Sequence, residues 1–304
     1  MEYGLLSKKI TNNCLNVYPF SQPWMLFTAR ARYNWIFAAI FVFLCTNYRS
    51  ISIETIAFFY SRHINCIVCE GRLGNKIFQQ VAVSLLAEKY DLLASYTREK
   101  EFAELGIPLW RGSKQLQGRY VKLTNVLLKE LLTTRDSSDL SIRLWLDSSD
   151  SYFQFPWFSN HLRFLFRGKF ERSLRLANPW RDRISANNDT FVHIRLGDMA
   201  EIGTRPAIDF INAVGTPRGH VFVSSESNNH VLVRRIVSHF SATLLDLSAV
   251  QTIQFGSTCA HLVLSDGTFS WTIGSMASLS ARIVIVPRKN EWSGNITHSD
   301  WDIV

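Results

Sequence analysis

The second half of the chain alternates strand-like and helix-like segments, and this alternation restricts the possible folds more than any other feature. The strand-like segments are short and rich in apolar and β-branched residues, at 191–196, 220–225, 244–247, 261–264 and 282–286. Helix-like segments lie between some of them, at 229–239 and 269–279. Strands that alternate with helices form parallel sheets. We therefore expect an α/β fold with a mostly parallel sheet.

One of these strands carries charge at its end. Within residues 191–198 apolar residues alternate with His193 and Arg195, and the strand stops at a glycine turn that contains Asp198. Ligand crevices of α/β proteins lie at the carboxyl ends of strands, and a guanidinium fork suits phosphate oxygens. Arg195 is therefore a candidate ligand for a phosphate or diphosphate leaving group. The alternative is an Arg195–Asp198 ion pair at the end of a buried strand.

Composition limits the possible partners. The chain has 304 residues with 47% apolar and 19% charged residues, enough for two domains with real cores. Its net charge is +8, but the basic residues are scattered, so we expect no nucleic-acid partner. Cys66 and Cys69 have CxxC spacing inside a strand-like run, which places the thiols on opposite faces. A metal or redox centre is therefore not expected there.

The N-terminal region resembles a membrane anchor. Residues 33–48 form an uncharged, aromatic-flanked run of 16 residues, and basic residues precede it. This run is slightly shorter than the about 20 residues of a typical membrane helix. The pattern predicts a cytosolic tail at 1–32, a signal-anchor transmembrane segment at 33–48 and a stem at 49–63. A buried core helix is the alternative for the apolar run.

The globular part begins with a glycine turn at 71–75, between a strand-like segment at 64–69 and a helix at 76–90. A glycine turn lets backbone approach a ligand, and the helix N-terminus favours an anion. Residues 152–170 are dense in aromatic side chains. Core packing is the favoured interpretation of that segment, and a sugar-stacking platform is the alternative. We expect two α/β domains, at 64–185 and 186–304.

Several segments, in chain order, resemble the motifs of α-1,2-fucosyltransferases, the glycosyltransferase family 11-like enzymes. Gly71-Arg72-Leu73-Gly74-Asn75 resembles their GRLGNQ motif, and His193-Ile194-Arg195-Leu196-Gly197-Asp198 resembles HxRRxD. Ser265-Asp266-Gly267-Thr268-Phe269-Ser270-Trp271 resembles a third motif of the STFSWW type, and Tyr152-Phe153-Gln154 resembles a YFQ segment. The resemblance covers about residues 64–290.

The resemblance implies a GT-B fold, in which two Rossmann-like domains face each other across a cleft. The 64–185 domain would bind the acceptor and the 186–304 domain would bind GDP-fucose. It further implies inverting transfer of fucose to a galactose-type hydroxyl of a galactose-terminated glycan, without a metal or other cofactor. Such an enzyme is expected in the Golgi membrane as a single-pass type II glycoprotein.

The resemblance also implies roles for individual residues. Arg195 would bind the diphosphate, and the proton acceptor for the sugar hydroxyl stays open between Asp198 and Glu226. The donor-binding candidates lie at strand ends and at one helix start: His193, Arg195, Ser224, Ser225, Glu226, Thr268, Phe269 and Ser270. The glycine-turn candidates are Gly71, Arg72, Gly74 and Asn75.

Some positions depart from the family pattern. The second arginine of HxRRxD is Leu196, the second tryptophan of the third motif is Thr272, and Asp266 adds an acidic group. A catalytically inactive GT-B pseudoenzyme that binds nucleotide or glycan is therefore the alternative.

Glycosylation sequons begin at Asn188 and Asn295, of which Asn295 is the favoured one. The pair Asp300 and Asp302 has DxD spacing, but we expect a frayed chain end there, which is a poor metal site.

Overall fold

The computed structural model describes residues 64–65, 71–114, 120–134, 143–145, 152–196, 205–287 and 296–304. All of them belong to one compact unit, Glu54–Val304. The predicted tail and membrane segment lie outside the described residues, as do Cys66, Cys69, Asp198 and Asn295. No helix in the described ranges is long and apolar enough to cross a membrane.

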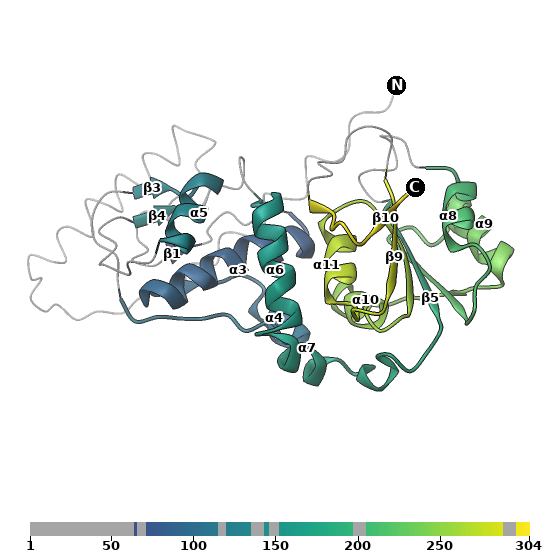
Figure 1. Ribbon diagram of the computed structural model, residues 1–304, viewed down its shortest axis with the longest axis horizontal. Helices are drawn as coiled ribbons and strands as arrows, with labels where there is room; N and C mark the ends of the chain where they lie inside the picture. The colour runs from purple at the N-terminus through teal and green to yellow at the C-terminus, as the bar shows by residue number, and fades with distance from the viewer. Residues whose placement is uncertain are drawn as a thin grey trace, which may run out of the picture. The chain divides into compact units, whose positions relative to one another are not determined.

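A six-stranded parallel sheet forms the centre of the C-terminal half (Figure 1). Its strand order is β10-β9-β8-β5-β6-β7. The strands are β5 (Thr190–Ile194), β6 (Val221–Ser225), β7 (Thr243–Leu244), β8 (His261–Ser265), β9 (Arg282–Val286) and β10 (Asp302–Ile303). The first strand, β5, lies in the middle and later strands extend to both sides, as in doubly wound nucleotide-binding sheets. The sheet confirms the predicted parallel α/β fold and is compatible with a Rossmann-like fold.

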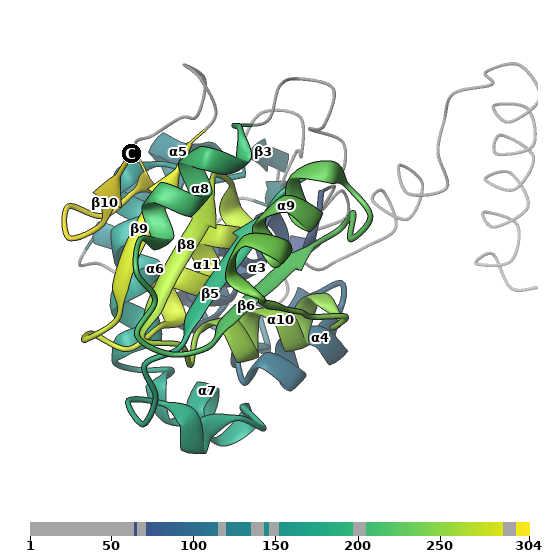
Figure 2. The same ribbon diagram turned by 90° about the vertical axis from the view of Figure 1, so that its right-hand side faces the viewer.

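Helices cover both faces of this sheet, and the alternation of side chains along β5 shows how. Phe191 belongs to one apolar cluster, which includes side chains of α10 (Ala249–Gly256) and α11 (Thr268–Met276). Val192 and Ile194 belong to a second cluster, with side chains of α8 (Ala207–Val214) and α9 (Val231–Phe240). Figure 2 shows α8 and α9 on one side of the sheet, with α11 behind it. Successive residues of β5 therefore point to opposite layers.

The N-terminal half is mainly helical, with short parallel strand pairs. Strand β1 pairs with β2 and β3 pairs with β4. The strands are β1 (Ile64–Asn65), β2 (Ala94–Ser95), β3 (Tyr120–Lys122) and β4 (Arg143–Trp145). The helices are α3 (Leu73–Tyr90), α4 (Glu99–Leu105), α5 (Asn125–Thr133), α6 (Pro156–Arg167), α7 (Glu171–Ala177) and a 3-10 turn at Arg181–Arg183.

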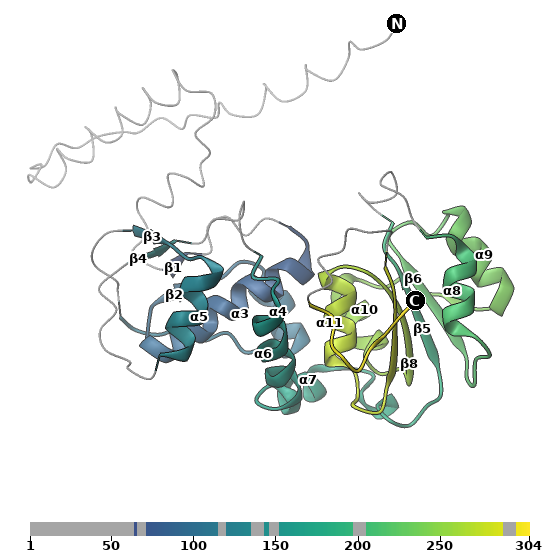
Figure 3. The same cartoon turned by 45° about the horizontal axis from the view of Figure 1, so that its top comes forward.

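Helices α3 and α6 pack against α11, which joins the two halves (Figure 3). The Phe78 ring of α3 lies 4.6 Å from the Trp271 ring of α11 and 6.2 Å from the Phe158 ring of α6. All three side chains are fully buried. The aromatic segment 152–170 thus packs mainly in the core, as expected, although Phe164 is 72% exposed.

Two expectations from the sequence were wrong. Helix α3 begins at Leu73, so Gly74 lies in its first turn and not in a preceding loop. A Cβ atom on Gly74 would lie 2.5 Å from the Phe269 backbone nitrogen, so the glycine is required by the close approach of α3 to α11. The chain end is also not frayed, because Trp301 is only 5% exposed and the adjoining Asp302–Ile303 segment pairs with β9.

Candidate functional site

A cavity of about 620 Å³ opens at the carboxyl ends of β5 and β6. Strands β5 and β8 are neighbours, and the connections leave this point in opposite directions, which is where doubly wound sheets bind ligands. The lining residues come from seven separate parts of the chain. They are Gly71–Asn75, Arg98, Tyr152, His193, Arg195, Ser224–Glu226, Leu247, Ala249, Thr252, Thr268 and Phe269.

Helices α3 and α11 start at this cavity without a side-chain cap, and so does the short α4, whose N-cap residue is Arg98. The N-cap residues of α3 and α11, Arg72 and Gly267, make no side-chain capping hydrogen bond. Helices α6, α7 and α8 also lack a side-chain cap, whereas α5, α9 and α10 are capped by Thr124, His230 and Ser248. Uncapped N–H groups and the helix dipole attract anions. The helix N-termini at the cavity therefore favour a negatively charged group there.

Gly267 allows the Arg195 side chain to lie against the start of α11. Its φ angle is +115°, a value that L side chains rarely adopt. A Cβ atom at this position would lie 2.5 Å from Nη1 of Arg195. The glycine thus brings the guanidinium beside the uncapped helix N-terminus.

Backbone hydrogen bonds fix the segment that carries Arg195. The Arg195 N–H donates to Oγ of Ser265, at the end of β8, over 2.9 Å. The next N–H, that of Leu196, donates to Oε2 of Glu226 over 3.0 Å. Glu226 also forms an ion pair with Arg72 of the glycine turn. Glu226 therefore links the ends of β5 and β6 to the start of α3.

Asn75 connects three of the motif segments through a single oxygen. Its Oδ1 accepts hydrogen bonds from Nε2 of Gln154, over 3.0 Å, and from the hydroxyl of Thr268. Phe153, which precedes Gln154, is fully buried and has a φ of +54°. Left-handed backbone at a non-glycine residue costs about 1–2 kcal/mol. This turn lets Phe153 enter the core while Gln154 reaches Asn75.

His193 is buried beneath the cavity and is kept neutral. Its Nδ1 shares a hydrogen bond of 2.7 Å with the Ser270 hydroxyl, and its ring lies 5.1 Å from the Phe269 ring. The pKa of His193 is lowered to about 4, mainly by burial; Glu226 opposes this shift, and Arg195 and Arg72 add to it. At neutral pH the imidazole adds no charge to the cavity.

The ionisable side chains that line the cavity are mostly basic. They are Arg72, Arg98 and Arg195 against one carboxylate, Glu226. With His193 neutral, an excess of positive charge faces the cavity. This excess of positive charge favours the binding of an anion such as a diphosphate.

The structure brings most of the predicted site residues together. All four glycine-turn candidates line the cavity, as do seven of the eight donor-binding candidates: His193, Arg195, Ser224, Ser225, Glu226, Thr268 and Phe269. Ser270 is 1% exposed and lies behind His193, where it holds the ring. Asp198 lies outside the described residues. Asn188 is exposed just before β5.

The departures from the motif pattern have clear places in the structure. Leu196 is fully buried in the cluster beneath α8 and α9, on the opposite face from Arg195, as the strand pattern predicts. Asp266 is 1% exposed and is not among the residues that line the cavity; it lines a small adjoining space with Arg195 and Arg205. Thr272 is fully buried, and its hydroxyl donates to the Thr268 carbonyl over 2.7 Å.

Six cavity residues were not predicted as site residues: Leu73 and Tyr152, which lie within the motif segments, and Arg98, Leu247, Ala249 and Thr252, which lie outside them. Arg98 is distant in sequence from every motif. The capping box formed by Ser248 and Gln251 could have been recognised in the sequence, and it would have predicted the start of α10 beside Leu247 and Ala249.

The described ranges contain no group of three or more His, Cys, Asp or Glu side chains that is arranged to hold a metal. Asp300 forms an ion pair with Arg163, and Asp302 forms one with Arg282. The DxD carboxylates are thus paired with arginines.

Comparison of the chain with protein-family models, with curated proteins and with solved structures gave no match.

Proposed function

We propose that this protein transfers fucose from GDP-fucose to a galactose-type hydroxyl of a glycan, with inversion and without a metal. One observation supports this most strongly. The segments that resemble α-1,2-fucosyltransferase motifs are far apart in sequence, yet they line one cavity at the sheet edge where nucleotides bind. Asn75 and Glu226 connect them directly.

The leaving GDP would be held by fixed charges. As the bond between fucose and the diphosphate breaks, negative charge grows on the diphosphate oxygens. Arg195, Arg72 and the N-termini of α3 and α11 offer preorganised donors for that charge. The nucleoside would extend along the end of β6 toward Leu247 and Ala249.

The acceptor hydroxyl would attack the anomeric carbon from the side opposite the diphosphate. A carbon–oxygen bond forms there while the bond to the diphosphate breaks, and the hydroxyl proton passes to a carboxylate. Glu226 is the carboxylate among the described lining residues, and Asp198 is the other candidate. Replacement of Glu226 by Gln separates the two: loss of turnover with retained GDP binding identifies Glu226.

The cellular setting is part of the same proposal. Residues 33–48 anchor a single-pass type II Golgi membrane protein, and a GT-B arrangement places the acceptor-side domain at 64–185 and the donor-side domain at 186–304. Asn295 and Asn188 would be glycosylated in the lumen.

A pseudoenzyme with the same cavity is the second candidate, and Leu196 is the observation in its favour. A core leucine replaces an arginine of the family motif and offers no donor to the nucleotide.

The test is transfer of labelled fucose to lactose-type acceptors by the full chain in excess EDTA. We expect acceptor-dependent GDP release that Arg195→Ala abolishes. Arg234→Ala, on the exposed side of α9, is the matched control and leaves release unchanged. GDP binding without release supports the pseudoenzyme. If the chain neither binds GDP nor releases it from GDP-fucose, both candidates are contradicted and a membrane-tethered adaptor remains.

A further inference from the structure

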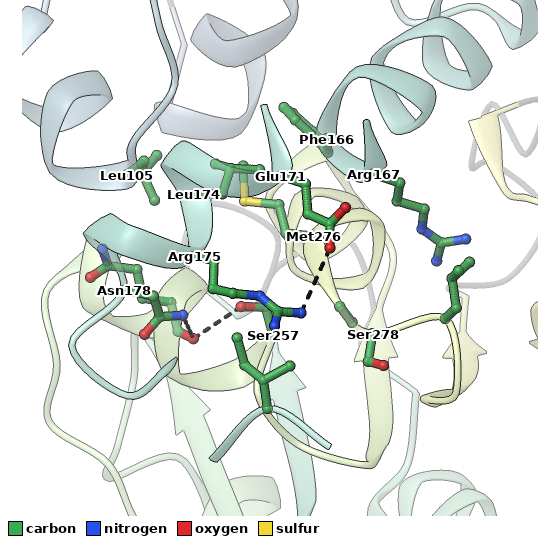
Figure 4. Close-up of a pocket in the computed structure, with 14 residues that line it drawn as sticks. Leu105, Phe166, Arg167, Glu171, Leu174, Arg175, Asn178, Ser257, Met276 and Ser278 are labelled. Carbon is green, nitrogen blue, oxygen red and sulfur yellow. Dashed lines mark hydrogen bonds and ion pairs between the residues drawn. The ribbon is translucent and has the colours of Figure 1, made fainter. Parts of the chain in front are cut away.

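A second cavity, of about 240 Å³, lies among α6, α7, α10 and the end of α11 (Figure 4). It shares no lining residue with the first cavity. Its apolar wall includes Leu105, Phe166, Leu174 and Met276. Figure 4 shows two arginines at its rim, Arg167 and Arg175, with Glu171 between them.

The neutral polar side chains of this cavity are already used within the protein. Asn178 Nδ2 donates to the Gln254 carbonyl over 2.8 Å, and the Ser257 hydroxyl donates to the same carbonyl over 3.0 Å. The Gln254 side chain donates to the Glu104 carbonyl over 2.7 Å. These groups stabilise the wall and leave the charged residues to recognise a ligand.

Arg167 differs from Arg175 in having a buried guanidinium nitrogen with no hydrogen-bond acceptor among the described residues. Glu171 lies 3.6 Å from Arg175 and pairs with it. The Nε of Arg167 is buried, and no acceptor among the described residues takes its hydrogen. Burial lowers the pKa of Arg167, Arg163 lowers it further, and Asp300 opposes them. Asp300 is itself engaged by Arg163. A buried N–H group on a cation destabilises the folded protein when it has no acceptor. Binding of an oxyanion beside Arg167 is therefore favoured.

We propose that this cavity binds a small carboxylate with an apolar body. The carboxylate pairs with Arg167, whose planar guanidinium donates hydrogen bonds to two oxygens side by side. The apolar body lies against Phe166, Leu174 and Met276. A volume of about 240 Å³ holds about eight groups the size of a water molecule, which matches a six-carbon acid.

Calorimetric titration of the full chain with sodium hexanoate tests this site. Hexan-1-ol removes the charge and acetate removes the apolar body. We expect both to bind at least about tenfold more weakly than hexanoate, because a charge-assisted hydrogen bond and several buried methylenes are each worth that much. Arg167→Gln is expected to weaken hexanoate binding about tenfold or more. Arg172→Gln, an equal charge change on the exposed side of α7, is the control and leaves binding unchanged.

We expect Arg195→Ala to leave the hexanoate affinity unchanged, because the two cavities share no lining residue; this distinguishes the site from nucleotide binding. Thermal unfolding of Arg167→Gln verifies that the variant is folded. Equal binding of hexanol and hexanoate, equal affinity of Arg167→Gln and the parent chain, or no hexanoate binding at millimolar concentration each overturns the proposal.

Discussion

The buried His193 makes stability depend on pH in a way that can be calculated. Its folded-state pKa is about 4, against about 6.5 for an unperturbed histidine. Below pH 6.5 the unfolded chain therefore binds a proton that the folded protein rejects. The contribution of neutral His193 to the free energy of unfolding is complete above pH 6.5 and is lost as the pH falls toward 4. Because one pKa unit is worth 1.36 kcal/mol, protonation costs about 3 kcal/mol in total.

Urea unfolding of the parent chain and of His193→Gln, at pH 7.5 and pH 4.5, measures this effect. Glutamine retains a hydrogen bond to Ser270 but does not titrate. The parent chain is expected to lose about 2–3 kcal/mol more than the variant between these pH values. His239→Gln, on exposed surface, is the control and behaves as the parent. Parallel losses in the parent chain and His193→Gln would refute the assignment of His193 as a buried neutral group.

Three further substitutions test other parts of the structure. Gly267→Ala is expected to weaken GDP binding about tenfold or more in calorimetry, because the new Cβ displaces Arg195; unchanged affinity would show that this contact is irrelevant. Trp301→Ala should lower the free energy of unfolding by about 3–5 kcal/mol in urea, as expected for a buried tryptophan, and a loss below about 1 kcal/mol would indicate a frayed chain end. Leu196→Arg should lower the melting temperature without a gain in transfer, since the side chain enters an apolar core; a stable, more active variant would contradict this placement.

The parallel sheet could be predicted from the sequence because most of its strands are recognisable from local residue patterns alone. Val192 and Ile194 alternate with His193 and Arg195, and the structure places these pairs on opposite faces of β5. The strand predicted at 282–286 matches β9. Each such segment is short, β-branched and bounded by turn residues, so local sequence determines it.

The start of α3 could not be predicted in the same way. Gly74 looks like part of a turn, since glycine disfavours helix interiors. Its place in the first helical turn depends on Phe269, almost two hundred residues later, whose backbone leaves no room for a Cβ atom. The C-terminal strand β10 was missed for a similar reason, because two residues have too little pattern and Trp301 is held by packing.

Within the candidate site, the sequence identified individual residues but not their partners. Asn75 was predicted as a turn residue, whereas its role as the acceptor for both Gln154 and Thr268 exists only once the chain is folded. Ser270 was predicted to contact the donor, and the structure places it behind His193. Helical spacing alone did not distinguish the cavity side of α11 from its buried side.

Titration of GDP-fucose into the full chain examines the donor site itself. The parent chain should bind, and Arg195→Ala should bind about 10- to 100-fold more weakly, as expected for loss of a charge-assisted hydrogen bond to a phosphate. Arg234→Ala should retain the parent affinity. Equal dissociation constants for the parent chain and Arg195→Ala, or no binding by a folded parent chain, would contradict the assignment of this cavity to a nucleotide-sugar donor.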